Sequence, residues 1–230
     1  MSPVSRVDPL MSDIVGWDVR TWSKAVECWG RAIDDAPPVL ECLELGAGPG
    51  GPSLWLALKG HRVLCTNQDS TERFASPLHR RYAFPGTIDY RDVNAREIPF
   101  DAQFDVVVFK SVLGGVGDPA DQERMIEGIH RALKPGGRLL FAENIRGTVA
   151  HRAARAVMNR RRRANWRFNP LDRLRELLSG FSDVQLHTNG VLAVFGVTEG
   201  QRRALATLDP ALMRVTPPRW QYMAYGVATK

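Results

Sequence analysis

The chain has 230 residues, of which 44% are hydrophobic and 24% are charged, and its formal net charge is +6. This length and composition fit a single globular domain over residues 1–230 with a full hydrophobic core. No apolar run approaches the roughly 20 residues needed to span a membrane, and the first residues lack the pattern of a secretory signal. We therefore expect a cytoplasmic protein without a membrane span.

The three cysteines are Cys28, Cys42 and Cys65, and the latter two lie inside apolar runs. We expect these two to be small core residues, and the three cysteines together indicate a reducing compartment. The sequence has no His/Cys cluster that would predict a protein-bound metal. Positive charge gathers between residues 146 and 175, which include Arg160–Arg163. This segment is either a solvated helical face or a surface that attracts an anionic partner.

Hydrophobic periodicity predicts helices and strands in alternation. Residues 17–35 place Trp22, Val26, Trp29 and Ile33 on one face of an amphipathic helix. Further helices are expected over 52–59, 71–82 and 118–133, with Pro77 splitting or kinking the second of these, and regular structure is expected again over 170–178. Strands are expected over 39–45, 61–67, 87–90, 105–109, 138–143, 184–187 and 222–228.

This alternation predicts an α/β fold with a parallel, doubly wound, Rossmann-like sheet of seven strands and helices on both faces. The rhythm changes after Glu143, where residues 146–169 are basic and permissive for helix. We expect this segment to be a helical lid, inserted over the edge of the sheet where ligands bind in such folds.

The segment VLECLELGAGPGG, residues 39–51, reads as a buried strand that passes through a glycine turn into a helix. Glycine at 46, 48 and 50 permits positive φ angles and close approach of a ligand to the backbone. The helix that follows presents free N–H groups at its start. A strand, glycine turn and helix in this order are typical of nucleotide or nucleoside sites.

Polar groups follow the other strands of the predicted sheet at the same edge. Because the carboxyl ends of parallel strands converge on one crevice, we expect these groups to form one site. The residues are Glu44 after the first strand, Asn67, Gln68 and Asp69 after the second, Asp92 and Val93 after the third, and Lys110 and Ser111 after the fourth.

Four motifs, LELGAGPGG, RDV, FDVVVFKSVL and LKPGGRLLFAEN, together resemble the class I S-adenosylmethionine-dependent methyltransferases over nearly the whole chain. A dinucleotide-binding domain would carry G-x-G-x-x-G instead. The resemblance implies S-adenosylmethionine as cofactor and S-adenosylhomocysteine as product.

The resemblance also implies residue roles. Gly46, Ala47, Gly48 and Gly50 contact the methionine part of the cofactor, and Glu44 orders that loop or receives the ammonium. Asp92 accepts a hydrogen bond from the adenine amino group, and the Val93 N–H donates to the ring. Lys110, Ser111 and Gln68 complete the cofactor site. This sequence departs from the family at Asn67, where an acid normally holds the ribose hydroxyls; Asp69 is the alternative residue for that role. Trp22 is either a cofactor contact or a core residue.

The segments GGPSLWLALKGHRV, FKSVLGGVG, LLFAENIRGTVAH and WQYMAYGVATK together resemble bacterial methyltransferases of polysaccharide and glycolipid biosynthesis. This resemblance implies a sugar or oligosaccharide hydroxyl as acceptor. His151 is the expected general base, with Glu143 as its partner or as an orienting group. Asn144, Arg155 and Trp166 are the expected acceptor contacts. Alternatives are another small-molecule acceptor, RNA held by Arg160–Arg163, or a non-catalytic scaffold. A homodimer and a divalent cation stay open, and nucleic acid is the less favoured partner.

Overall fold

The computed structural model describes residues 8–34, 38–162 and 166–230, and the side chains of residues 8–34, 38–157 and 166–230. Within these residues, seven strands form one mixed sheet in the order β3-β2-β1-β4-β5-β7-β6. The first five strands run parallel, whereas β7 pairs antiparallel with both β5 and β6. Their bounds are β1 Glu41–Leu45, β2 Arg62–Asn67, β3 Thr87–Asp92, β4 Phe104–Lys110, β5 Leu133–Asn144, β6 Asp183–Asn189 and β7 Met223–Thr229.

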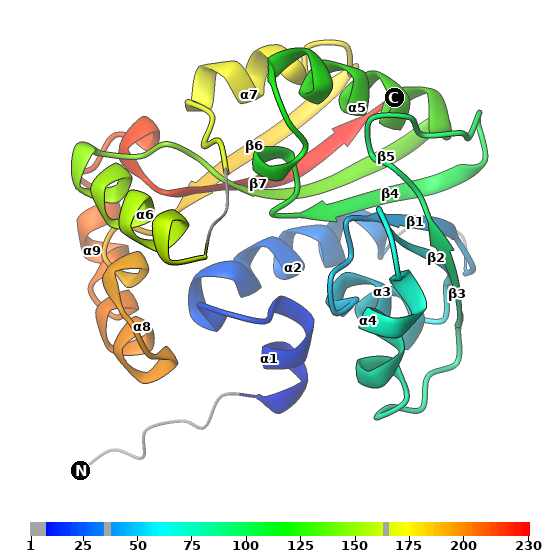
Figure 1. Cartoon of the computed structure of the whole chain (residues 1–230), viewed down its shortest axis with the longest axis horizontal. Helices are drawn as coiled ribbons and strands as arrows, with labels where there is room; N and C mark the ends of the chain where they lie inside the picture. Colours follow the sequence, from blue (N-terminus) through cyan, green and yellow to red (C-terminus); the bar gives the residue numbers. More distant parts are fainter. Residues whose placement is uncertain (1–7, 35–37, 163–165) are drawn as a thin grey trace.

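Helices cover both faces of this sheet (Figure 1). α5 and α7 lie on one face, α2, α3 and α4 lie on the other, and α6, α8 and α9 gather at one end of the sheet. The bounds are α1 Pro9–Val15, α2 Val19–Ile33, α3 Gly51–Leu58, α4 Thr71–His79, α5 Pro119–Ala132, α6 Val149–Arg162, α7 Leu171–Leu177, α8 Glu199–Ala206 and α9 Asp209–Met213. The predicted doubly wound architecture is confirmed, with a mixed rather than wholly parallel sheet.

Strand β4 shows why both faces need cover. Val106 and Val108 pack into the cluster that includes α2 and α3, whereas Val107 and Phe109 pack into the cluster that includes α5 and α7. All four side chains are at most 2% exposed, as expected when successive side chains point to opposite faces. Burial of each such side chain contributes about 1.5–3 kcal/mol before conformational entropy is subtracted.

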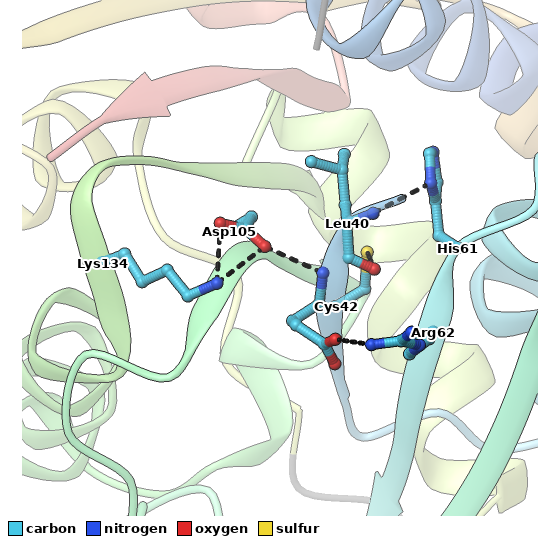
Figure 2. Close-up of polar contacts among 7 residues, drawn as sticks. Leu40, Cys42, His61, Arg62, Asp105 and Lys134 are labelled. Carbon is cyan, nitrogen blue, oxygen red and sulfur yellow. Dashed lines mark hydrogen bonds and ion pairs between the residues drawn. The ribbon is translucent and has the colours of Figure 1, made fainter. Parts of the chain in front are cut away.

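Asp105 fastens the amino-terminal ends of β1, β4 and β5 (Figure 2). Its carboxylate accepts hydrogen bonds from the Glu41 N–H at 2.9 Å and from the Lys134 ammonium at 2.9 Å. Arg62 on β2 extends the set through an ion pair of 2.8 Å with the Glu41 carboxylate. These contacts align neighbouring strands at the edge opposite the candidate site.

The structure corrects several expected boundaries. α1 was not expected, although Asp8 caps it by accepting a hydrogen bond from the Leu10 N–H and Pro9 occupies its first turn. α8 and α9 were also missed. α4 contains Pro77 without splitting and ends at His79, because a proline near the last turn removes only one N–H from the helix. The helical part of residues 146–169 is α6, and its function as a lid stays a prediction.

Candidate functional site

The glycine turn after β1 adopts the backbone that its sequence requires. Gly46, Gly48 and Gly50 have φ angles of +62°, +53° and +84°, all in the left-handed region that favours glycine. A Cβ at Gly46 would lie 2.7 Å from Val112, and a Cβ at Gly50 would lie 2.4 Å from the His79 ring. A Cβ at Gly48 would meet nothing within 4 Å. The turn is therefore packed from behind and open at Gly48.

Two charged groups stand at the carboxyl ends of β1 and β4. Glu44 is 1% exposed, and its Oε2 accepts hydrogen bonds from the N–H and the hydroxyl of Ser53 at the start of α3. Burial raises the pKa of Glu44 to about 7, against the opposing effects of Ser53 and of the Lys110 charge. Burial lowers the pKa of Lys110, whose ammonium lies 5.1 Å from the centre of the Trp22 ring.

Asn67 joins the end of β2 to the glycine turn. Its Oδ1 accepts the Gly48 N–H at 2.8 Å, and its Nδ2 donates to the Gly48 carbonyl at 3.4 Å. An amide can make both contacts, whereas a carboxylate has no donor for the second one. The amide at the position expected to hold an acid is thus explained by the loop itself.

The expected adenine contacts of Asp92 and Val93 need correction. The Asp92 carboxylate accepts hydrogen bonds from Thr71 N, Thr71 Oγ1 and Ser70 N, and so faces the start of α4. The Val93 N–H donates to the Asn67 carbonyl at 2.7 Å. Both groups are engaged in joining β2, β3 and α4, because the β3 register sets Asn67 opposite Asp92. The Val93 side chain still lines a cavity.

Two neighbouring cavities open at the carboxyl ends of the parallel strands. The smaller, of about 240 Å³, lies among the loops after β2, β3 and β4. The larger, of about 370 Å³, lies between the glycine turn, the end of β4 and the segment around α1. They share Gly46, Ser111 and Trp166. The smaller is lined by residues that include Asn67, Gln68, Val93, Asn94, Ala95, Arg96, Val112 and Val116.

The larger cavity combines aromatic walls with positive charge. Its lining includes the predicted residues Glu44, Ala47, Gly48, Lys110, Asn144 and Arg155, together with Trp166. It also includes residues that the sequence analysis did not assign to a site: Asp13, Ile14, Val15, Gly16, Val194 and Arg202. The pair Asp8-Pro9, a helix cap followed by a proline in the first turn, is the sequence signal that could have predicted α1. Nothing local marked Val194 or Arg202.

A hydrogen-bonded chain orients the polar groups of this cavity. An Nη2 hydrogen of Arg155 is donated to Asn144 Oδ1 at 3.2 Å, and Asn144 Nδ2 donates to Ser111 Oγ at 2.9 Å. Ser111 has a φ of +57°, a strained angle for a residue with a side chain. Arg155 also donates to the carbonyls of Ile145 and Tyr222, and its guanidinium lies 4.4 Å from the Phe168 ring centre.

The expected catalytic pair is not brought together in the cavity. His151 is 1% exposed, its Nδ1 accepts the Thr148 N–H at 3.1 Å, and its Nε2 lies 2.7 Å from the Val191 carbonyl. Both ring nitrogens are therefore used inside the fold, and neither lines either cavity. The geometry corrects our expectation of His151 as the base, since a base must reach the acceptor proton.

Glu143 is 2% exposed and supports the loop after β4. Its Oε2 accepts the N–H groups of Val112 and Leu113 at 2.9 and 2.7 Å, and its Oε1 accepts that of Asn144 at 2.8 Å. Burial raises the pKa of Glu143 to about 7, and these N–H donors oppose the rise. Its position corrects a direct catalytic role to one of holding the loop that carries Ser111.

Two further expected cofactor contacts lie outside the cavities. Trp22 is fully buried in the core cluster between α2 and the sheet. It contacts the site through the Lys110 ammonium above its ring and through Trp17, whose ring centre lies 5.1 Å from its own. Of the two roles expected for Trp22, the structure therefore shows that of a core residue. Asp69 is exposed and lines neither cavity. Over the described residues, no group of three or more His, Cys, Asp or Glu is arranged to hold a metal ion.

Comparison with known proteins places this site in context. Residues 43–141 match the family described as a methyltransferase domain. A ubiquinone/menaquinone biosynthesis C-methyltransferase of Vibrio vulnificus is 30% identical over 141 residues, which are 58% of this chain and 51% of that protein. Its counterpart in a Shewanella species is 27% identical over 140 residues, which are 58% and 53% of the two chains. The chain spans about half the length of these curated relatives.

Solved structures agree over more of the chain. A methyltransferase of Methanosarcina mazei, described as SAM-dependent, superposes with a TM-score of 0.62 at 20% identity, covering 87% of this chain and 96% of that one. The fold is that of the class I methyltransferases. A geranyl diphosphate C-methyltransferase of Streptomyces coelicolor also shares this methyltransferase fold, with a TM-score of 0.62, 15% identity and coverage of 90% and 75%.

Over the described residues, no helix is long and apolar enough to cross a membrane.

Proposed function

We propose that this protein is a methyltransferase that uses S-adenosylmethionine to methylate a small molecule. The observation that carries the proposal is the pair of cavities that share Gly46, Ser111 and Trp166 at the carboxyl ends of the parallel strands. The smaller cavity fits the nucleoside, and the larger fits the methionine part together with an acceptor. S-adenosylmethionine is the cofactor of the solved methyltransferases that share this fold.

Donor binding in this proposal uses the open side of the glycine turn. Gly48 offers backbone without a Cβ in the way, and Glu44 offers a carboxylate to the donor ammonium. Val93, Asn94 and Val112 line the cavity proposed for the adenine. Gln68, also in that lining, is the side chain left to contact the ribose once Asn67 is bound to Gly48.

Two acceptor classes compete within this proposal. A sugar or oligosaccharide hydroxyl has in its favour the polar groups of Asn144 and Ser111 and the aromatic ring of Trp166. Against it, the described lining contains no histidine, so the usual base for a neutral hydroxyl is missing there. An acceptor that enters already ionised, and reacts at its oxygen or at a carbon conjugated with it, needs no such base. The names of the curated relatives, both C-methyltransferases, favour this second class.

Other parts of the functional expectation stay proposals. RNA binding would rely on Arg160–Arg163, whose side chains lie outside the described residues, and it remains the less favoured partner. Light scattering tests whether the protein is a homodimer in solution. Activity with and without a chelator tests whether it requires a divalent cation. A cytoplasmic location is tested by cell fractionation.

The test is transfer of a labelled methyl group from S-adenosylmethionine to a panel of sugars, oligosaccharides, phenols and enolisable carbonyl compounds, with RNA as a further substrate. We expect S-adenosylhomocysteine to bind with micromolar-order affinity in calorimetry and label to enter one acceptor class. Absence of binding by both donor and product would contradict the proposed function as a whole.

A further inference from the structure

Lys110 is a cation of the larger cavity whose charge no direct partner neutralises in the described structure. It ends β4, lines the cavity and lies over the Trp22 ring. Two carboxyl groups, Glu44 and Glu143, influence it only through the longer-range field, without a hydrogen bond or ion pair to its ammonium. A half-buried ammonium without an ionic partner is costly unless a ligand supplies one.

The nearby carboxyl groups have other partners. Glu143 spends both oxygens on backbone N–H groups of the loop after β4 and of Asn144. Glu44 is bound through one oxygen to Ser53. Asp13, the further acid of the lining, pairs with Arg81 at 2.8 Å and with the Tyr82 hydroxyl. None of the three is placed to neutralise Lys110 by contact.

Ser111 adds a donor beside this charge. Its Oγ already accepts a hydrogen bond from Asn144 Nδ2, which leaves its own O–H free to donate elsewhere. Asn144 is in turn fixed by Arg155, a second cation of the same lining. The cavity therefore presents an ammonium and an oriented hydroxyl at the point where it meets the smaller cavity.

The donor makes the local charge more positive. S-adenosylmethionine carries a sulfonium in addition to its ammonium and carboxylate, so its binding adds net positive charge beside Lys110 and Arg155. We infer that the acceptor enters this cavity as an anion, with its negative oxygen held by the Lys110 ammonium and the Ser111 hydroxyl. Trp166 and Phe168 form the aromatic wall against which a flat acceptor packs.

An anionic acceptor also removes the need for a base in the lining. Its electron pair, on oxygen or on a carbon conjugated with it, forms the bond to the methyl group. The carbon–sulfur bond breaks, its electron pair stays on sulfur, and the products are a neutral methylated acceptor and a thioether. This inference rests on the proposed methyltransferase function and adds to it the charge of the acceptor.

The test uses probes that do not require the natural acceptor to be known. Calorimetry measures binding of benzoate, of its neutral analogue methyl benzoate, and of inorganic phosphate to protein saturated with S-adenosylhomocysteine. We expect benzoate to bind at least about tenfold more tightly than the ester, as for a hydrogen bond to a charged group. Phosphate reports whether a tetrahedral anion also occupies the subsite.

Variants separate Lys110 from the rest of the cavity. Lys110→Met should remove the preference for benzoate, whereas Lys110→Arg keeps the charge and should keep most of the preference. Lys24→Met is the matched control, because Lys24 is exposed on α2, pairs with Glu27 and lines neither cavity of the site. Thermal melting confirms that each variant is folded.

A measurement on the unaltered protein guards against a variant that fails to fold. Benzoate stays ionised above pH 6, so a rise in pH changes the protein rather than the probe. Burial lowers the pKa of Lys110, so its ammonium loses its proton below the pKa of an exposed lysine. Benzoate affinity should therefore fall as the pH approaches the pKa of an exposed lysine. Glu44, Glu143, Asp13, Arg155 and Arg202 are the other charged groups facing this space or adjoining it.

The outcomes are distinguishable. Equal affinity for benzoate and its ester would overturn the inference. If the protein still binds S-adenosylhomocysteine, the proposed function is unaffected by that result. The inference would also be overturned by a Lys110→Met protein that loses S-adenosylhomocysteine about tenfold but keeps the benzoate preference, since Lys110 would then hold the donor carboxylate. Failure of S-adenosylhomocysteine to bind at all would strike the proposed function instead.

Discussion

At the scale of single residues, Glu44 links cofactor affinity to pH. Its buried carboxyl has a pKa of about 7, and the proposed donor ammonium binds the ionised form better. Affinity for S-adenosylhomocysteine should therefore rise as pH increases through 7, by up to about tenfold between pH 6 and 8. Calorimetry at several pH values measures this slope, and Glu44→Gln should flatten it. A slope retained in the variant would assign the titration to another group.

Asn67 gives a second prediction at this scale. Asn67→Asp keeps an acceptor for the Gly48 N–H but loses the donor to the Gly48 carbonyl. Loss of one such bond costs about 1 kcal/mol, so S-adenosylhomocysteine affinity should fall about fivefold. Asp69→Asn is the control, because Asp69 is exposed and lines neither cavity. A larger loss in the control would place the ribose at Asp69.

The identity of site residues was more predictable than their orientation. The glycine pattern predicted the turn because positive φ angles are a local property of the backbone. His151 and Asp92 were chosen for their chemistry and their place in the sequence. Their side chains instead bond to Val191 and Thr71, which lie 40 and 21 residues away. No local pattern reports such partners.

At the scale of elements, the contact between α1 and α3 depends on the absence of a side chain. A Cβ at Gly51 would lie 2.0 Å from the Ile14 carbonyl oxygen, so Gly51→Ala must displace α1. We expect a loss of about 1–3 kcal/mol in unfolding free energy and weaker S-adenosylhomocysteine binding, because α1 lines the larger cavity. Urea denaturation and calorimetry measure the two effects.

Gly30→Ala is the matched control for this substitution. Gly30 lies in α2, and a Cβ there would meet nothing within 4 Å. Alanine is the better helix former, so this variant should be about 0.5–1 kcal/mol more stable than the natural sequence. Equal effects at the two glycines would contradict the proposed α1–α3 contact.

Long elements were predictable because their hydrophobic periods extend over several turns or strand residues. The stripe of α2 and the alternation in β4 both correspond to buried faces. α1, α8 and α9 are helices of seven, eight and five residues, too short for a period to stand out. Thr198 and Gln201 form a capping box at α8, a signal that propensity alone did not single out.

At the scale of the whole molecule, Asp18 connects the amino-terminal segment to the last strands and makes stability depend on pH. Its carboxylate accepts the Tyr222 hydroxyl, and burial raises its pKa from 3.8 to about 7. The folded state therefore holds a proton that the unfolded state has released between these values. Unfolding free energy should fall as pH rises through this window, by about 1–3 kcal/mol from this group.

Asp18→Asn isolates that contribution, because its amide oxygen can still accept the Tyr222 hydroxyl without titrating. Urea denaturation at pH 5 and pH 8 should show a smaller loss in the variant than in the natural protein. Four histidines, three of them buried, have lowered pKa values and act in the opposite direction, but equally in both proteins. Identical losses would refute the role of Asp18.

The position of β7 has a consequence for how the chain folds during synthesis. Residues 223–229 insert between β5 and β6, and Tyr222 just before them binds Arg155 through its carbonyl. While the ribosome is still adding the residues before them, β5 presents an unpaired edge and β6 has no neighbour. An unpaired edge invites pairing with other chains. The interval before β7 is in place is thus when the chain is most open to pairing with other chains along that edge.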